Sequence, residues 1–383
     1  MKKLNYILCL SGLIALTQCT KREASPIGSE YFDLQDLSEV QHKTIYAAES
    51  DSSFFVSAET GAGDFFYIGH MKDIHAASLI QFAGIEDTSD VDSAVVFLNI
   101  YRTVNNNDIP GEIHVYQASS SWDELTLTQN DFDASLIGKF IGTITVNNDT
   151  TDSLFLKLDN ELIAEWMDTT TSESNYGLYL DSDDDLMLQC YSQDISSEIS
   201  TGPQIWLYFK DDTTRYPEKY ESTSDLFLAE SNMDPNGSHL RIESGTAYRS
   251  YLEFDLSAFY PNTIINRATI TLISDTTKTL PQLDESKGLS ACYLDSAFDD
   301  FSTAEFKSEN SATGNFEDNE CVIELTYHIQ EIISDELNNL GFLIKGQYET
   351  SELSRIIFYS SQADSSWKPK LDITYTLAPD NQL

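Results

Sequence analysis

The sequence predicts an all-β fold of two tandem jelly-roll-type β-sandwich domains, each with one short helix. Short segments alternate apolar and polar residues with a period of two, and loops containing Gly, Pro or Asn separate them. The clearest segment is Arg249–Ser257, in which Leu252, Phe254 and Leu256 share one face and the more polar residues share the other. A similar order of segments occurs earlier in the chain, which indicates an internal duplication.

The length of 383 residues suits two domains, which we expect at residues 42–212 and 213–378. Both copies open with a mostly apolar segment, Phe54–Glu59 in the first and Asp225–Glu230 in the second. The strands that follow match in order. In the first copy they are 65–69, 78–82, 94–98, 112–116, 175–180 and 188–192; in the second they are 239–243, 249–257, 268–272, 289–294, 339–344 and 356–360.

Each copy also contains one apolar stripe with helical spacing, which we interpret as a helix that covers a core. The stripes are Leu158, Leu162, Ile163 and Trp166 in the first copy, and Leu325, Ile329, Ile332, Ile333 and Leu337 in the second. Each copy then closes with a Pro followed by alternating residues, at 203–209 and 369–375. Pro is best tolerated at the first position of a strand, where its missing N–H costs least.

The second copy resembles the DNRLRE domain family. The resemblance covers nearly all of residues 213–378 and rests on a pattern spread over the domain: Arg249–Ser257, the aliphatic strand after it, Leu325–Thr326, Gly341, Tyr359–Ser360 and Pro369–Tyr375. It implies a β-sandwich module of bacterial and archaeal surface or secreted proteins, related to disaggregatase repeats and to carbohydrate-binding modules of the alginate-binding kind. The first copy diverges, since Ala77 stands where Arg249 would be.

The N-terminus predicts export. Lys2 and Lys3 precede a short apolar run, and Leu16–Cys19 resembles a bacterial lipobox, so residues 1–19 read as a lipoprotein-type signal peptide with lipidation at Cys19. Gln18 departs from the usual small residue, which keeps ordinary cleavage and secretion open. Thr20 favours the outer membrane or cell surface by resemblance to Gram-negative sorting. Residues 20–41 read as a tether and residues 379–383 as a tail, and the lipid would be the only contact with a membrane.

Composition excludes one large class of partners. The chain has 63 acidic and 22 basic residues and a formal net charge of −41. Nucleic acid and anionic bilayers would be repelled by such a surface. Because 41% of the residues are hydrophobic and 11% are aromatic, the acidity indicates solubility and not disorder.

Three cysteines remain beyond the signal. Cys292 and Cys321 lie in the same copy and could pair in an oxidising compartment, or both could be small buried hydrophobic residues. The sequence leaves both readings open. Cys190 has no His or Cys neighbour, which indicates packing and not nucleophilic chemistry.

No catalytic motif is present, and the six histidines lack ligand spacing, so we expect no enzyme. No cofactor is certain, and structural calcium is the one candidate because oxygen-rich loops suit it. The candidate ligands are Asp181, Asp183 and Asp185 in one loop and Asp234 and Asn236 in another. A solvated hairpin loop is the alternative reading of both.

Aromatic residues on outward strand faces are the candidates for carbohydrate binding, because flat rings stack on the apolar faces of sugars. In the closing strand of the first copy Ile205, Leu207 and Phe209 share a face, which leaves Trp206 and Tyr208 on the other. Their counterparts in the second copy are Asp372 and Thr374, so the fold does not demand rings there. Trp122 and Trp367, in loops, are weaker candidates for which packing is the alternative.

These observations predict a non-catalytic surface or secreted protein that binds polysaccharide or surface glycan, or mediates adhesion, through two modules. A structural or interaction protein of an envelope or matrix assembly is the alternative. A polysaccharide-active enzyme ranks third, since the abundance of carboxylates prevents any acid and base pair from being singled out.

Overall fold

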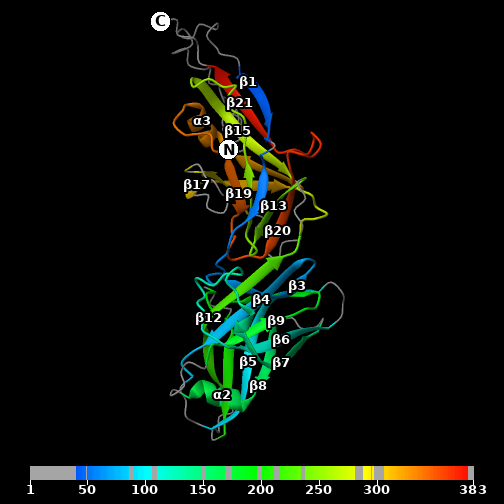
Figure 1. Ribbon diagram of the computed structural model, residues 1–383, viewed down its shortest axis with the longest axis vertical. Coiled ribbons are helices and arrows are strands. Elements are labelled where there is room, and N and C mark those ends of the chain that lie inside the picture. The colour runs from blue at the N-terminus through cyan, green and yellow to red at the C-terminus, as the bar shows by residue number, and fades with distance from the viewer. Residues whose placement is uncertain are drawn as a thin grey trace, which may run out of the picture.

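A computed structural model describes residues 40–48, 50–85, 90–105, 110–147, 152–168, 175–195, 201–210, 216–233, 238–280, 288–294, 296 and 306–377. This part of the chain is nearly all β and forms two large antiparallel sheets, each folded over an apolar core, which confirms the predicted all-β sandwich fold (Figure 1). The predicted signal peptide and the C-terminal tail lie outside the described residues, as does all but the end of the tether. Whether the chain forms two domains stays a prediction.

The first of the two sheets has ten strands, β3 to β12, in the order β12-β11-β5-β10-β3-β4-β9-β6-β7, with β8 paired to β5. Its strands are β3 (Phe65–Met71), β4 (Ile74–Phe82), β5 (Val91–Asn105), β6 (Gly111–Ala118), β7 (Ile137–Val146), β8 (Ser153–Leu158), β9 (Leu178–Asp181), β10 (Leu186–Tyr191), β11 (Gln204–Phe209) and β12 (Glu218–Ser231).

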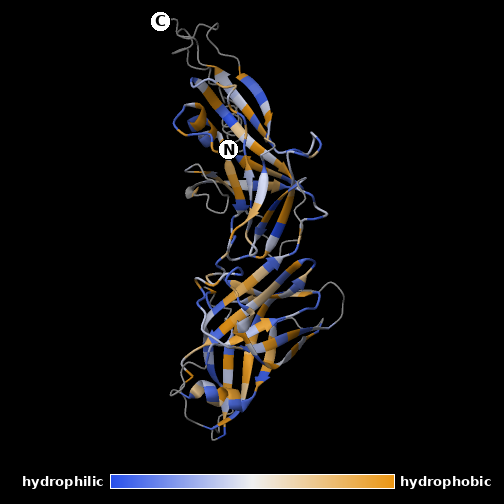
Figure 2. Cartoon of the chain, in the orientation of Figure 1, coloured by the Kyte–Doolittle hydropathy of each residue, from blue (hydrophilic) through white to orange (hydrophobic). Residues whose placement is uncertain are grey.

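Long strands close the ten-stranded sheet on itself. The start of β12 pairs with β11 and the rest of β12 pairs with β4, while β5 pairs with β11 at one end and β10 at the other. The enclosed core consists of alternate residues of these strands, such as Phe66, Ile68, Val96, Leu98 and Leu188. Figure 2 shows the same alternation as hydrophobic and hydrophilic bands along the strands.

The second sheet has eleven strands, in the order β1-β21-β15-β18-β17-β16-β19-β14-β13-β20, with β2 paired to β14. Its strands are β1 (Val40–Tyr46), β2 (Ser52–Phe55), β13 (His239–Ser244), β14 (Tyr248–Leu252), β15 (Thr263–Ile273), β16 (Leu289–Leu294), β17 (Phe306–Glu317), β18 (Glu320–Glu324), β19 (Phe342–Gly346), β20 (Ser354–Tyr359) and β21 (Lys370–Leu377). Leu252, Phe254 and Leu256, predicted to share the buried face of one segment, all lie in its core.

Each sheet carries one α-helix, where the apolar stripes predicted it. Helix α2 (Asn160–Met167) buries Leu162, Ile163 and Trp166, and helix α3 (Thr326–Ile333) buries Ile329, Ile332 and Ile333. A single turn of 3-10 helix, η1 (Ala134–Leu136), precedes β7. Within the described residues, neither of these helices nor any other is both long and apolar enough to cross a bilayer.

The opening strands of the two predicted copies are exchanged between the sheets. Strands β1 and β2 come first in the chain but pair with β21 and β14 of the eleven-stranded sheet. Strand β12, which lies after the predicted boundary at residues 212–213, pairs with β11 and β4 of the ten-stranded sheet. The predicted boundary therefore does not coincide with a break in strand pairing.

One aspartate in each exchanged segment makes the same contact. Asp225 accepts a hydrogen bond from the backbone N–H of Gln193, at 2.8 Å. Asp51 accepts one from the N–H of Ser361, at 2.6 Å, and a second from the Ser361 hydroxyl. Gln193 follows β10 and Ser361 follows β20, the matching strands of the two copies, so the exchanged segments occupy equivalent places.

A buried ion cluster joins the two sheets. Arg241 and Arg355 both bind the fully buried carboxylate of Glu243. Arg355 also reaches Asp73, in the turn between β3 and β4, with 2.6 Å between Nη1 and Oδ1. Two buried guanidinium groups thus share two carboxylates, of which Glu243 is fully buried and Asp73 is partly exposed. This cluster and the strand exchange fix one sheet to the other.

Candidate functional site

The outer face of β8, β5, β11 and the start of β12 carries a cluster of aromatic side chains. Strand pairing aligns Phe155, Phe97 and Gln204 in one cross-strand row. It aligns Lys157, Val95, Trp206 and Lys219 in the next row. Tyr208 follows, opposite Ser93. We call these side chains the aromatic face.

Alternation explains why the rings lie outside. Ile205 and Leu207 point into the core and are fully buried, so Trp206 and Tyr208 must point the other way, and both are partly exposed. In β8 the same pattern buries Leu154 and Leu156 and leaves half of the Phe155 side chain exposed, at 50%. The aromatic face is therefore built on regular strands that are braced from behind by the core.

The three central rings pack against one another. The indole of Trp206 stacks on Phe97, with ring centroids 5.0 Å apart and planes 16° apart. Phe155 meets Trp206 edge-on at 5.6 Å and is tilted against Phe97 at 5.4 Å. Offset and edge-to-face contacts of this kind hold rings in defined positions. The result is a preformed apolar surface beside solvent.

Polar groups surround these rings. The Lys219 ammonium lies 4.4 Å from the Trp206 ring centroid, in cation–π distance. The indole N–H donates to the Gln204 side-chain carbonyl at 2.8 Å, which fixes the orientation of the indole. Lys157 is exposed on the other side of Trp206 in the same row. The exposed carboxylate of Glu221 lies opposite Gln204 at the edge of the face. A ligand there would meet apolar rings together with two ammonium groups, an amide and this carboxylate.

The structure places Trp206 and Tyr208 on the outer face of β11, as the alternation predicted. Sequence reasoning did not find the residues that surround Trp206, which are Phe97, Phe155, Lys157 and Lys219. In β5 residues 94–98 are all apolar, so the sequence there does not distinguish an inward from an outward Phe. Phe155 alternates with the buried Leu154 and Leu156, which places it outward, but only the cross-strand register brings it next to Trp206, and a single sequence does not contain that register.

Trp122 and Trp367 lie apart from the aromatic face. Trp122 donates its indole N–H to the carbonyl of Tyr176 at 2.8 Å and packs on a small apolar cluster over the outside of β4, β9 and β12. Trp367 is 40% exposed and meets Tyr359 edge-on at 4.5 Å. Their contacts match the packing alternative stated for both.

The first predicted calcium loop is occupied by protein contacts. Asp181 Oδ1 lies 2.6 Å from His75 Nε2, and Tyr179 donates to the other carboxylate oxygen. Asp183 is exposed and Asp185 is partly buried. No group of three or more His, Cys, Asp or Glu side chains is placed to hold a metal ion in the part of the chain that the structure describes. Asp234 and Asn236 lie outside that part, and structural calcium stays a prediction at both loops.

The His75–Asp181 pair shifts the pKa values of both partners. The hydrogen bond that His75 makes to the Asp181 carboxylate raises the pKa of His75 against the opposing effect of burial. Burial alone would raise the pKa of Asp181, but the hydrogen bond and the charge of His75 outweigh it and lower that pKa. The pair is a partly buried structural contact; the ring of Tyr179 next to it is buried against Phe132 and Tyr116.

Cys292 and Cys321, for which pairing or burial as two small residues was left open, are both free and buried in the structure. Cys321 lies in the main core of the eleven-stranded sheet, whereas Cys292 lies in a separate cluster with Tyr251 and Leu343 on the opposite face. Burial raises the pKa of Cys292 to about 11 and that of Cys321 to about 12, so both thiols stay protonated. Cys190 is also free and buried in a core, and its pKa is raised further by burial.

Comparison with known proteins adds no relative. No family model matches the chain, and no curated protein matches it. The resemblance of residues 213–378 to the DNRLRE domain family stays a prediction.

Proposed function

We propose that the protein is a non-catalytic, exported surface protein that binds polysaccharide or surface glycan through the aromatic face. The observation that carries the proposal is the cluster of Trp206, Phe97 and Phe155, three mutually packed rings on an outward sheet face. A flat sugar ring buries apolar C–H groups against such a surface. The fold itself does not require these rings, because Asp372 holds the place of Trp206 in the other sheet.

The charges around Trp206 favour a glycan with negative charge. Lys157 and Lys219 flank Trp206 in one cross-strand row, in a chain with only 22 basic residues against 63 acidic ones. Two ammonium groups beside the rings would pair with carboxylate or sulfate groups of a polymer that the rest of the surface repels. We therefore expect acidic polysaccharides to bind more tightly than neutral ones in a binding test.

The position of β1 in the fold supports a proposal that the aromatic face points away from a membrane. Val40, the first residue of β1, pairs with Thr376 at the end of the molecule opposite β8 and α2 (Figure 1). A lipid on Cys19 and a tether up to residue 41 would enter the fold there. The aromatic face, on β5, β8 and β11, would then point outward from the outer membrane or cell surface. If Cys19 is not lipidated, the protein would be secreted.

The test is affinity electrophoresis of the mature protein in gels that contain acidic or neutral polysaccharides, with calcium and with chelator. The variant Trp206→Ala, Tyr208→Ala is expected to bind at least tenfold more weakly, a loss of about 1.4 kcal/mol or more. Trp367→Ala is the matched control, because it removes a partly exposed indole from the other sheet and should leave binding unchanged.

Failure of the wild-type protein to bind any polysaccharide would contradict the proposal. Equal loss in the Trp367→Ala control would contradict the assignment of the face. A structural role in an envelope or matrix assembly is the second candidate. It is favoured by the contact of Arg355 with Asp73, through which the buried pair of Arg355 and Glu243 in one sheet is linked to the other sheet of an elongated molecule.

A further inference from the structure

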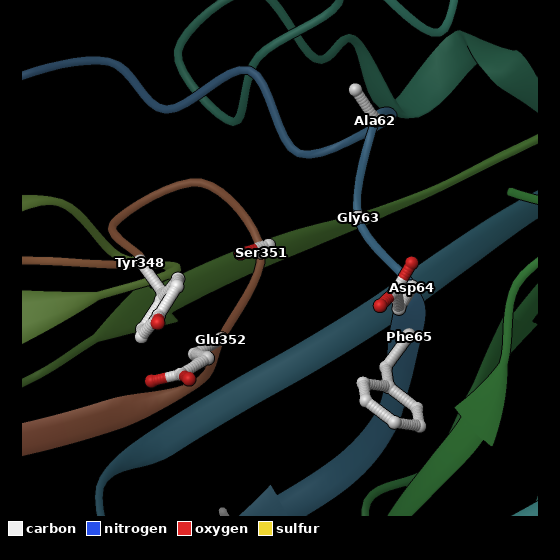
Figure 3. Close-up of a pocket in the computed structure, with 7 residues that line it drawn as sticks. All are labelled: Ala62, Gly63, Asp64, Phe65, Tyr348, Ser351 and Glu352. Atoms are coloured by element: carbon white, nitrogen blue, oxygen red, sulfur yellow. The ribbon is translucent and has the colours of Figure 1, made fainter. Parts of the chain in front are cut away.

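A cleft between the two sheets is separate from the aromatic face. The segment Ala62–Phe65, which leads into β3, lies opposite Tyr348, Ser351 and Glu352 in the loop between β19 and β20 (Figure 3). The cleft encloses about 460 Å³ and is open on one side. A Cβ at Gly63 would lie 3.1 Å from Ser351 Cα, so the two backbones already approach closely. Both sheets are needed to form it.

Aromatic rings form part of its walls. Phe65 lies on one wall and Tyr348 on the other, and 42% of Tyr348 is exposed. Phe65 belongs to a group of three rings, because its ring centroid lies 4.8 Å from that of Tyr101 and 5.5 Å from that of Tyr191. The faces of such rings carry partial negative charge and attract cations.

The remaining polar groups of the cleft mostly accept hydrogen bonds. Asp64 and Glu352 contribute carboxylates, one from each sheet, and among the lining side chains only the hydroxyls of Ser351 and Tyr348 can donate. None of the seven lining residues is Lys, Arg, His, Asn or Gln. A sugar hydroxyl needs both donors and acceptors, whereas an ammonium or guanidinium group only donates. The lining therefore suits an organic cation better than a sugar.

The net charge of the whole chain also favours a cation in this cleft. The formal net charge of −41 raises the local concentration of cations at any concave part of the surface. Asp194 lies near this wall, and its pKa is raised mainly by burial and further by the charge of Asp64. The negative potential thus extends beyond the cleft itself.

We propose that this cleft binds an ammonium or guanidinium group between Phe65 and Tyr348, with Asp64 and Glu352 as its hydrogen-bond acceptors. The group belongs either to a small amine or to a Lys or Arg side chain of a partner polypeptide. The site is independent of the glycan-binding proposal, since it uses other residues and the opposite charge. Its ligand would be held by both sheets at once.

Saturation-transfer NMR with the full mature chain tests the proposal, with tetramethylammonium and the end-blocked peptide Gly-Arg-Gly as probes. Saturable binding is expected, and Asp64→Asn, Glu352→Gln should weaken it at least fivefold. The matched control is Asp92→Asn, Glu161→Gln, which removes two exposed carboxylates beside α2 at the far end. Ala62→Trp fills the cleft without changing its charge and should also abolish binding.

Equal weakening in the control pair would overturn the proposal, because bulk charge would then explain the binding. Unchanged binding in Ala62→Trp, or no saturable binding of either probe, would overturn it as well. Tighter binding of the peptide than of tetramethylammonium assigns the site to a basic side chain, and the reverse assigns it to a small amine. Because Ala62 and Asp64 are exposed, these variants should keep the wild-type thermal unfolding curve.

Discussion

The outer faces of β11 and β21 hold equivalent positions in the two sheets but carry different chemistry. One cross-strand row reads Phe155, Phe97 and Gln204 in the ten-stranded sheet and Val322, Thr271 and Lys370 in the eleven-stranded sheet. The next row reads Lys157, Val95, Trp206 and Lys219 in the first and Glu324, Thr269, Asp372 and Thr44 in the second. The same architecture thus tolerates rings or small polar groups at these places.

One polar contact, in contrast, is shared by the two sheets. Asp225 and Asp51 both bind the loop after the matching strands β10 and β20, through Gln193 and Ser361. The difference between shared and unshared positions separates structural residues from candidate functional ones. By this criterion Trp206 is a candidate for function, and the contact of Asp225 belongs to the fold.

Removal of residues 40–55 tests the strand exchange and should have the greatest effect on stability. It deletes β1 and β2, exposes the edges of β21 and β14, and removes Ala47 from the core. We expect the eleven-stranded sheet to lose more than about 4 kcal/mol of stability. Hydrogen exchange should accelerate in β21 and β14 before β4 and β11. Equal acceleration in both sheets would contradict the assignment of β1 and β2 to one of them.

Arg355→Met tests the ion cluster, which the ten-stranded sheet lacks at this position. Met187 occupies the matching place in β10, so the variant gives β20 the residue that β10 has at this position. Loss of a buried partner of Glu243 and Asp73 should cost about 2 to 4 kcal/mol in urea unfolding, because Glu243 then keeps Arg241 as its one charged partner among the described residues. Arg267→Met, which breaks an exposed pair with Glu324, should cost at most about 1 kcal/mol. Similar costs for the two variants would argue against a buried junction.

Asp225→Asn tests the shared aspartate. Burial, reinforced by the charges of Asp194 and Glu124, raises the pKa of Asp225 to about 7. The raised pKa means that its contribution to stability is present below pH 4 and is lost as the pH rises through 7. Asp225→Asn should therefore stabilise the protein by about 1 to 3 kcal/mol at pH 8 and have less effect at pH 5. Asp51→Asn should destabilise it slightly, because Asp51 is partly exposed and loses charge-assisted hydrogen bonds.

The all-β fold and both helices follow from periodicity in the sequence, because alternation and helical spacing are local. The strand exchange does not, since alternation says that residues 52–55 and 225–231 form strands but not which sheet edge they join. Of the aromatic face, the sequence predicts Trp206 and Tyr208 but not the other residues. Trp206 stands out because its counterpart is Asp372, whereas Phe97 lies in an unbroken apolar run and Phe155 joins the face only through the cross-strand register. The cleft between Phe65 and Tyr348 joins residues nearly 300 positions apart, and no local pattern predicts it.

The most direct test replaces the two outward residues of β11 with the residues at the matching positions of β21. The variant Trp206→Asp, Tyr208→Thr gives β11 the residues of β21, and both its unfolding free energy and its binding to acidic polysaccharide would be measured. We expect polysaccharide binding to be lost while stability changes by less than about 1.5 kcal/mol, because both side chains lie on a surface that the core does not require. Retained binding, or unfolding of the ten-stranded sheet, would contradict the account that the rings serve ligand binding and not the fold.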